Sequence, residues 1–415
     1  MQTRFHSFER RLLQRISTSL GTAPIEIILG NESVCPPSVT PVARVIIRDR
    51  RTLTALILDP EVGFGEAYSD GRILVEGDLV KFLEAAYRGR ARSSAAGSWY
   101  SRLLSKWMQR VQDNTLGGSR QNIHHHYDLG NDFYQLWLDR ALVYTCAYFP
   151  TPTSTLEKAQ SAKMEYVCRK LRLQPGETVV EAGCGWGSLA LHMARNYGVS
   201  VKAFNVSHEQ IAYARQQARQ EGLDQQVEFI EDDYRNVSGK FDVFVSVGML
   251  EHVGLDHYQE LGRTIHRSIS DSGRGLLHFL GRNQPAPLSR WIRKRIFPGA
   301  YIPTLRQALT VLEPWNFAVQ DVENLRCHYA KTMEHWLERF ERSERQIEAM
   351  YDSRFVRMWR LYLAGSLAAF RTGTLQLFQL VFTGPRCRPI SWTRDHLYDH
   401  AASPLEQETW TPAMS

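Results

Sequence analysis

The pattern of apolar and polar residues divides the chain into a short N-terminal part and a longer C-terminal part. The β-rich runs 24–29 and 43–49 precede a stretch, 65–89, that ends in a helical pattern. We therefore expect a small α/β domain over residues 1–95. Arginine, glycine, serine and alanine dominate the stretch that follows, which predicts an exposed basic linker over 96–120.

From residue 121 onward, strand-like and helical stretches alternate. Helical patterns at 188–198 and 208–222 lie between apolar runs. The runs typical of strands are 178–183, 199–207, 227–232, 242–248, 275–281, 317–325 and 374–384. Such alternation is typical of a mostly parallel, doubly wound sheet. The pattern predicts a Rossmann-like α/β domain of seven strands with helical insertions over 121–395, followed by a tail over 396–415.

Composition excludes a disordered or low-complexity chain, since 43% of the 415 residues are hydrophobic and 23% are charged. Fifty Lys and Arg against 44 Asp and Glu give a net charge of +6, which favours an anionic partner, either a nucleic acid or a membrane face. The six cysteines are scattered, which favours reduced thiols and a cytosolic protein. We expect no signal peptide and no membrane span, because no apolar run approaches the roughly 20 residues that a span needs.

The sharpest local signal is a turn with three alternating glycines. An apolar strand ends in Glu181 and passes through Gly183, Gly185 and Gly187 into a helix. Glycines let the backbone approach a ligand closely and adopt conformations that a Cβ disfavours. The G-x-G-x-G spacing differs from the G-x-G-x-x-G of dinucleotide sites and favours S-adenosylmethionine over NAD. The alternative is a tight turn without a ligand.

Polar residues after the next two strands are weaker candidates for cofactor binding. An acidic residue often holds the ribose hydroxyls at this place in related folds, whereas here Asn205 or Gln210 would take that role. Asp233 and Tyr234 follow the third strand, where an acid and an aromatic ring can meet the edge and the face of an adenine. Both pairs also fit ordinary loop chemistry.

Four long blocks indicate the family. They are HHYDLGNDFYQLWLDRALVYTCAYF at 125–149, the run 151–187 that ends in the glycine turn, GMLEHVG at 248–254 and HYAKTMEHW at 328–336. In this order they resemble the cyclopropane-fatty-acyl-phospholipid synthase family, which includes mycolic acid cyclopropane synthases and fatty-acid C-methyltransferases. The resemblance covers essentially all of 121–395 and, more weakly, the N-terminal part.

The resemblance implies an S-adenosylmethionine-dependent methyltransferase domain. Its expected activity is transfer of a methylene group to the double bond of unsaturated phospholipid acyl chains, giving cyclopropane fatty acids. The cofactor contacts that it implies are Tyr144, Thr145, Gly183, Gly185, Gly187, Asn205, Gln210 and Tyr234. A bound bicarbonate serves as base in this family, and its cage matches Cys146, Glu251, His278, Leu280 and Tyr329.

This chemistry requires negative potential in a dry cavity. Methyl transfer to an alkene moves positive charge from a sulfonium to a chain carbon, which carboxylate and aromatic groups stabilise while water is excluded. Glu251 would orient a small oxyanion base, and His278, Tyr329 and the backbone near Cys146 would hydrogen-bond it. Taken singly, Glu251 also fits a helix cap, His278 a core histidine, Tyr329 a packing aromatic and Cys146 an inert thiol.

One position departs from the family. Reference synthases carry a cysteine in a helix that reads Tyr-Leu-x-x-Cys, and Ser366 takes that place here. The mechanism needs no cysteine nucleophile, because the alkene is the nucleophile and forms no adduct with the enzyme. We interpret Ser366 as a wall residue. The alternative activity is a fatty-acid C-methyltransferase that gives a methyl or methylene branch without ring closure.

The expected partners are unsaturated phospholipids at an anionic membrane surface, with the protein cytoplasmic and peripheral to the inner face. The run 290–299 mixes cations with large apolar residues and fits either a lid on lipid headgroups or a solvated helix face. The resemblance suggests a homodimer. RNA is disfavoured because stacking aromatics do not interleave with the basic residues, and a lipid carrier needs neither the glycine turn nor the cage. Three consecutive histidines, 124–126, lack metal-site spacing, so no metal is expected.

Overall fold

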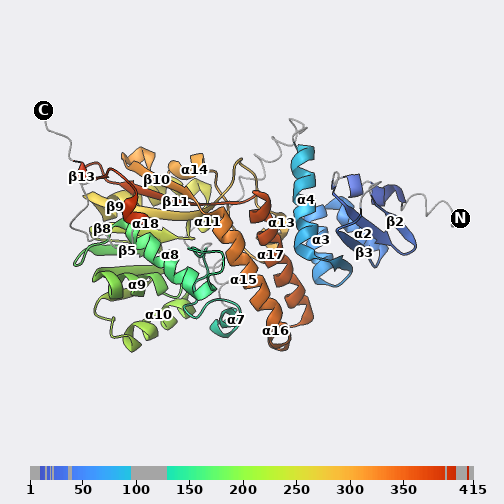
Figure 1. Ribbon diagram of the computed structural model, residues 1–415, viewed down its shortest axis with the longest axis horizontal. Coiled ribbons are helices and arrows are strands. Elements are labelled where there is room, and N and C mark those ends of the chain that lie inside the picture. The colour runs from blue at the N-terminus through green and yellow to red at the C-terminus, as the bar shows by residue number, and fades with distance from the viewer. Residues whose placement is uncertain are drawn as a thin grey trace. The chain divides into compact units, whose positions relative to one another are not determined.

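The computed structural model describes residues 10–14, 16–18, 20, 23–35, 40–94, 129–387, 390–398 and 409–410 (Figure 1). The predicted linker, the three histidines and most of the predicted tail lie outside these residues. The chain forms two compact units. The first unit contains Met1–Gln112, Ala286–Pro298 and Tyr329–Leu375, and the second contains Asp113–Pro285, Gly299–His328 and Gln376–Ser415. Each unit thus combines segments that are far apart in sequence. The predicted division of the chain at residues 95, 120 and 395 stays a prediction.

A seven-stranded sheet forms the centre of the second unit. Its strands are β5 (Thr178–Ala182), β6 (Ser200–Asn205), β7 (Val227–Glu231), β8 (Phe241–Val247), β9 (Ile269–Gly281), β10 (Ala318–Asn324) and β11 (Gln376–Thr383). They lie in the order β10-β11-β9-β8-β5-β6-β7. The strands from β9 to β7 are parallel, and β11 is antiparallel to both of its neighbours. This topology confirms the predicted Rossmann-like, mostly parallel fold.

Helices cover both faces of this sheet. One face packs against α8 (Leu156–Leu171), α9 (Ser188–Tyr197) and α10 (His208–Gln220). The other face packs against α11 (Leu250–Val253), α12 (Tyr258–Ser268) and α14 (Leu305–Leu309). Along β9, Leu276 joins the first apolar cluster and Leu277 the second, because consecutive strand side chains point to opposite faces. Burial on both faces explains the nearly continuous apolar character of the strands.

The first unit combines a smaller sheet with several helices. The strands β1 (Ile25–Leu29), β2 (Glu32–Val34), β3 (Ala43–Ile47) and β4 (Ile73–Gly77) lie in the order β2-β1-β3-β4. The helices are α2 (Arg50–Leu58), α3 (Pro60–Ser69), α4 (Leu79–Ser94), α13 (Arg290–Arg295), α15 (Arg326–Arg342, from residue 329 on), α16 (Glu344–Met350) and α17 (Ser353–Thr372). The long helix α17 packs on both α3 and α4.

One carboxylate, Glu66 on α3, joins three segments of the first unit. It accepts hydrogen bonds from Arg295 of α13 at 2.7 Å and from Arg354 of α17 at 3.0 Å, and Lys294 Nζ lies 3.6 Å away. The hydrogen bond from Arg295 is the main reason that the pKa of Glu66 lies below its ordinary value. The Glu66 side chain is 17% exposed, and its partners are more exposed, so water and salt screen these ion pairs only in part.

Helix α13 contains the basic run that the sequence associated with a lid. Trp291 and Ile296 are buried, and a Cβ at Gly65 would lie 2.3 Å from the Trp291 ring. Arg290 lies 2.6 Å from the Asp59 carboxylate, so three of the four cations of α13 pair with acids of the first unit. That this run contacts lipid headgroups stays a prediction. Within the described ranges, every helix is too short or too polar to cross a membrane.

Replacing Glu66 by Gln removes the charge that these cations share. We expect the free energy of unfolding of the full chain to fall by about 1–3 kcal/mol, the usual scale for hydrogen bonds to charged groups. The pKa of Glu66 is lowered in the folded state, so its contribution is present above the ordinary value of 4.5 and is lost as the pH falls through the folded value. Urea denaturation at neutral and at acidic pH measures both effects.

The matched control is Glu76→Gln on β4, where the side chain is exposed and makes no ion pair with another described residue. Equal destabilisation by the two substitutions would contradict the special role of Glu66.

Candidate active site

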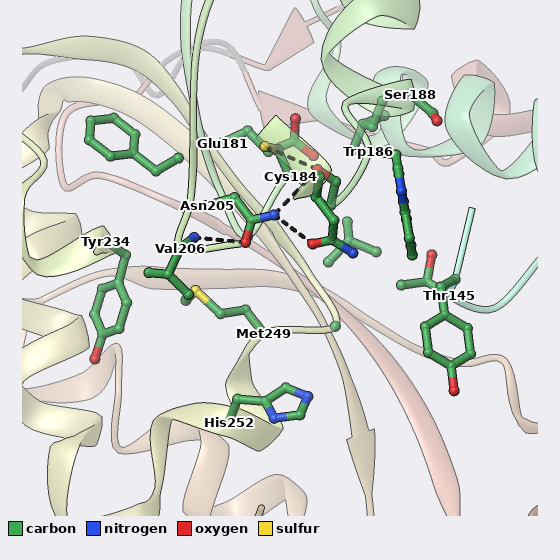
Figure 2. A pocket seen from close by; sticks show the side chains of 18 of the residues that line it. Thr145, Glu181, Cys184, Trp186, Ser188, Asn205, Val206, Tyr234, Met249 and His252 are labelled. Carbon is green, nitrogen blue, oxygen red and sulfur yellow. Dashed lines mark hydrogen bonds between the residues drawn. The ribbon is translucent and has the colours of Figure 1, made fainter. Parts of the chain in front are cut away.

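A pocket lies at the carboxyl ends of β5, β6 and β8 in the second unit (Figure 2). Strand β5 has β8 on one side and β6 on the other, and ligands of open α/β sheets bind at such a switch point. All but one of the residues predicted to bind the cofactor line this pocket. They are Tyr144, Thr145, Glu181, Gly183, Gly185, Asn205, Gln210, Asp233 and Tyr234. Their individual roles stay a prediction.

The exception, Gly187, has a packing role. Its φ of 84° lies in the left-handed region, and a Cβ there would come within 2.5 Å of the Phe229 ring and 2.9 Å of Ala214. Gly185, with φ of 56°, instead faces open space, because a Cβ there would meet no atom within 4 Å. One glycine therefore lets α9 begin close to the sheet, and another leaves a cradle that a ligand can fill.

Amide side chains at the end of β6 form one wall of this cradle. Asn205 Nδ2 donates to Gln210 Oε1 at 2.7 Å and to the Gly185 carbonyl at 3.3 Å, as Figure 2 shows. Ser207 caps α10 by accepting from Gln210 N, which fixes Gln210 in the first turn. Both amides are buried, so ribose recognition at this strand end would use ordered amide groups in place of an acid.

Asp233 and Tyr234 form another wall after β7. The Asp233 carboxylate caps the short helix η1 (Tyr234–Asn236) by accepting from Arg235 N at 3.0 Å, and it lies 3.2 Å from Arg235 Nε. The Tyr234 ring is buried, and its hydroxyl has no hydrogen-bond partner among the residues that the structure describes. An acceptor or donor on a ligand would satisfy this hydroxyl.

Aromatic packing holds Tyr144 at the pocket. Its ring meets Trp137 edge-on at 5.2 Å, and Tyr134 lies 5.5 Å from it and 5.0 Å from Trp186. Trp186 Nε1 in the glycine turn also donates to Asn131 Oδ1 at 2.7 Å. The glycine turn and the segment 131–145 are thus joined by ring contacts and by a hydrogen bond.

Helix α8 makes hydrogen bonds with the end of this segment, at Val143 and Thr145. Gln160 Nε2 donates to the carbonyls of Val143 and Thr145 at 3.2 and 2.8 Å. One turn later, Lys163 Nζ donates to Thr145 Oγ1 at 3.2 Å and lines the pocket. Our sequence interpretation missed Lys163. The available signal was a lysine on the apolar face of α8, where Met164 and Val167 pack in the core.

Two buried, oppositely charged groups face this pocket. Burial lowers the pKa of Lys163 to about 8, and burial raises the pKa of Glu181 to about 7 while Lys163 opposes that rise. Glu181 Oε2 accepts no hydrogen bond from any described residue. S-adenosylmethionine carries a carboxylate and an ammonium at its amino-acid end. A buried ammonium and a buried carboxylate in an open glycine cradle fit this zwitterion.

A second buried acid lies at the start of α11, directly after β8. Glu251 is 5% exposed, and its Oε1 accepts a hydrogen bond from Leu280 N of β9. Its Oε2 has no partner within the described part of the chain, and burial raises the pKa of Glu251 to about 7. His278 lies two residues before Leu280 on the same strand and is 2% exposed. The structure thus joins Glu251 to Leu280 by a hydrogen bond, and His278 lies on the same strand as Leu280.

The remaining predicted site residues are Cys146, Tyr329 and Ser366. Cys146 is fully buried in the second unit, where its Sγ lies 3.2 Å from the Ala147 carbonyl. Tyr329 and half-buried Ser366 belong to the first unit, and Tyr329 stacks on Phe370 with ring centroids 4.5 Å apart. The roles of Cys146 and Tyr329 in the cage, and of Ser366 as a wall residue, stay predictions. Among the described residues, no group of His, Cys, Asp or Glu is arranged to hold a metal ion.

Comparison with known proteins identifies the family. The sequence profile described as mycolic acid cyclopropane synthetase matches residues 100–380. A probable fatty acid methyltransferase from Pseudomonas putida is 32% identical over 380 residues, which span 89% of this chain and 94% of that protein. The chain belongs to the mycolic acid cyclopropane synthetase family. This result confirms the family and the class of enzyme that the four blocks suggested, an S-adenosylmethionine-dependent methyltransferase.

Other relatives agree with this assignment. The cyclopropane-fatty-acyl-phospholipid synthase of Escherichia coli K12 is 42% identical over 259 residues, or 62% of this chain and 66% of that protein. Among solved structures, the mycolic acid cyclopropane synthase CmaA1 complexed with SAH and CTAB has a TM-score of 0.61 and 29% identity, covering 64% of this chain and 98% of its own. Family members therefore include enzymes named for cyclopropane synthesis and for methyl transfer.

The buried charge of Lys163 predicts a pH-dependent cofactor affinity. Lys163→Met keeps the length of the side chain and should weaken S-adenosylmethionine binding about 10- to 100-fold, the scale of one charge-assisted hydrogen bond. Because burial lowers the pKa of Lys163 to about 8, wild-type affinity should decline as the pH rises through that value. The decline should be smaller in the variant, where only the amino group of the ligand loses its charge over this range. Isothermal titration calorimetry across this pH range measures both.

Lys202→Met on β6 is the control, since Lys202 is 49% exposed and pairs with Glu228 at the surface. Unchanged affinity in Lys163→Met would remove Lys163 from the cofactor site.

Proposed function

We propose that this protein forms cyclopropane fatty acids by adding a methylene group from S-adenosylmethionine to the double bond of unsaturated phospholipid acyl chains. The observation that carries the proposal is Glu251, a buried carboxylate with one unpartnered oxygen in the described residues. It accepts a hydrogen bond from Leu280 on the strand that also carries His278, and it precedes His252, which lines the cofactor pocket. An alkene substrate requires a base in a dry site, because a carbon-bound hydrogen must leave.

The electron balance defines what the site must do. The π electrons of the alkene form a bond to the methyl carbon, the carbon–sulfur bond breaks, and its electron pair stays on the neutral thioether. Positive charge then lies on the neighbouring chain carbon. Loss of a proton from the added methyl group leaves the electron pair that closes the ring. Buried carboxylate and aromatic groups stabilise the cation, and exclusion of water prevents its capture as an alcohol.

The residues present fit a small oxyanion as the base. Oε2 of Glu251 and Nε2 of His278 are both buried, and neither has a hydrogen-bond partner among described residues. A bicarbonate, when bound there, would supply a basic oxygen for the departing proton. Glu251, held by the Leu280 N–H, would accept its hydroxyl hydrogen, and His278 would donate to one of its oxygens. Cys146 and Tyr329 complete this cage in our proposal.

A fatty-acid C-methyltransferase is the second candidate. It forms the same cation but loses a different proton and leaves a methyl or methylene branch. Two observations favour it: Ser366 stands where reference synthases carry cysteine, and the Pseudomonas putida relative that spans most of this chain has the name of a fatty acid methyltransferase. The two activities share every residue named above, so only the product separates them.

The lipid substrate places the protein at a membrane surface in this proposal. Phospholipid acyl chains lie inside a bilayer, so we propose a cytoplasmic protein that binds peripherally to the anionic inner face, and a homodimer as its assembly. Arg293 is the cation of α13 that makes no ion pair with a carboxylate among the described residues, and it lies beside Arg290 and Lys294 at the surface of the first unit.

Glu251→Gln tests the proposed base site. The substitution keeps the shape of the side chain but removes its charge, so we expect turnover on unsaturated phospholipid vesicles to fall about 100-fold or more, as for other groups aimed at transition-state charge. S-adenosylmethionine affinity should remain close to that of the wild type, because Glu181 and Lys163 provide the cofactor charges. Transfer of labelled methyl groups and calorimetric titration measure the two quantities.

Glu228→Gln, at an exposed position of β7, is the control for a simple loss of a carboxylate. Turnover of Glu251→Gln equal to that of this control would exclude Glu251 as the residue that holds the base.

The product decides between ring and branch. With unsaturated phospholipid vesicles and S-adenosylmethionine, we expect each modified chain to gain one CH₂ unit and to show the shielded proton signals of a cyclopropane in NMR spectra. Vinylic or branched-methyl signals with the same mass gain would establish the C-methyltransferase instead. Vesicles made only of saturated lipids are the control, because they lack the alkene nucleophile.

A further inference from the structure

Two antiparallel strands determine the surroundings of His278. On β9, His278 stands directly opposite Gln379 of β11, so the two side chains project from the same face of the sheet. Gln379 is 0% exposed and His278 is 2% exposed. Gln379 Nε2 lies 3.0 Å from His278 Nδ1, which is a hydrogen-bond distance. Nothing in the sequence analysis identified Gln379.

We infer that Gln379 is a positioning residue that donates to Nδ1 of His278 and thereby keeps the imidazole hydrogen on Nε2. This inference rests on the proposed function, because it makes Nε2 of His278 the donor to the anionic base that Glu251 holds. Gln379 itself touches neither cofactor nor substrate in this assignment.

The argument begins with the protonation state of the ring. Burial lowers the pKa of His278 well below its ordinary value, and the positive charges of Lys163 and Lys170 lower it further, so the imidazole is neutral at physiological pH. A neutral imidazole has one N–H and one acceptor nitrogen. The partner at Nδ1 therefore decides which role Nε2 has.

The hydrogen-bonding capacity of the pair indicates which group donates. Gln379 Nε2 faces His278 Nδ1, and Oε1 has no donor among the described residues. An amide nitrogen offers hydrogens and no acceptor lone pair, so Nδ1 accepts in this arrangement. The single hydrogen of the neutral ring then lies on Nε2.

The two tautomers have opposite effects on an anion at Nε2. In the Nε2–H tautomer, the ring donates to the anion and stabilises it. In the Nδ1–H tautomer, Nε2 would direct a lone pair at a negative oxygen of the base that Glu251 holds in our proposal. An amide nitrogen at Nδ1 can only donate, whereas a carboxylate there would accept a hydrogen from Nδ1 and favour the other tautomer.

The tautomer is directly measurable in the full-length protein. With ¹⁵N-labelled histidine, long-range ¹H–¹⁵N correlation spectra distinguish protonated from unprotonated ring nitrogens. His278→Asn identifies the signals of His278 among the 14 histidines of the chain. We expect the Nε2–H pattern for His278, and an Nδ1–H pattern would overturn the inference whatever the activity of the protein.

Two variants then connect the tautomer to turnover. Gln379→Leu removes the donor and should populate the Nδ1–H form, lowering kcat about 10- to 100-fold, as is typical when a supporting hydrogen bond is lost, with unchanged S-adenosylmethionine affinity. Gln379→Glu places an acceptor at Nδ1 and should convert the ring fully, with a larger loss. Gln376→Leu is the matched control: Gln376 lies on the same strand and accepts from Asn324 at 2.9 Å.

The outcomes separate this inference from the function on which it rests. A wild-type ring with Nε2–H, together with a lipid product whose formation Gln379→Leu impairs, supports both. Retention of the Nε2–H tautomer and of wild-type kcat in Gln379→Leu contradicts the inference alone. An Nε2–H ring in a protein that modifies no unsaturated lipid contradicts the proposed function and leaves the hydrogen bond itself established.

Discussion

The second unit must bury several ionisable side chains at one edge of its sheet, and this constraint shapes the rest of the site. Lys163, Glu181 and Glu251 are each at most 5% exposed, and an unpaired buried ion costs several kcal/mol. The protein partly meets this cost with hydrogen bonds, from Lys163 to Thr145 and from Leu280 to Glu251. It leaves one oxygen of each acid without a partner in the described residues, so a bound ligand of matching charge would complete the site.

The sheet topology brings these groups together with little help from loops. Glu181 lies one residue before the end of β5, Glu251 follows β8 and His278 lies on β9, and these three strands are neighbours. Helix α8 then presents Gln160 and Lys163 one turn apart, so that both reach the segment that carries Thr145. The proposed cofactor contacts, Glu251 and His278 are therefore supported by elements of one unit, which favours precise placement of reacting groups.

The strands and the glycine turn could be predicted because each has a local signal. Alternating strands and helices identified the seven-stranded sheet, and the blocks around Glu251 and Tyr144 identified the family. Lys163 and Gln379 could not be found in this way, since their importance arises from contacts with residues distant in sequence: Thr145 for one and His278 for the other. The same reason explains α13, whose cations resemble a free basic surface until Glu66 and Asp59 are placed beside them.

The interleaved segments of the first unit also set an order of assembly. Glu66 and Arg354, which pair in the folded unit, are 288 positions apart in the chain. At translation rates of about 5–20 residues per second, roughly 15–60 s separate their emergence from the ribosome. During that interval the whole sheet of the second unit up to β10 is made, whereas α3 and α4 still lack the helix α17 that covers them. The first unit thus begins to be synthesised before the second but cannot be completed until α17 is made. Until then the faces of α3 and α4 that pack against α17 stay uncovered.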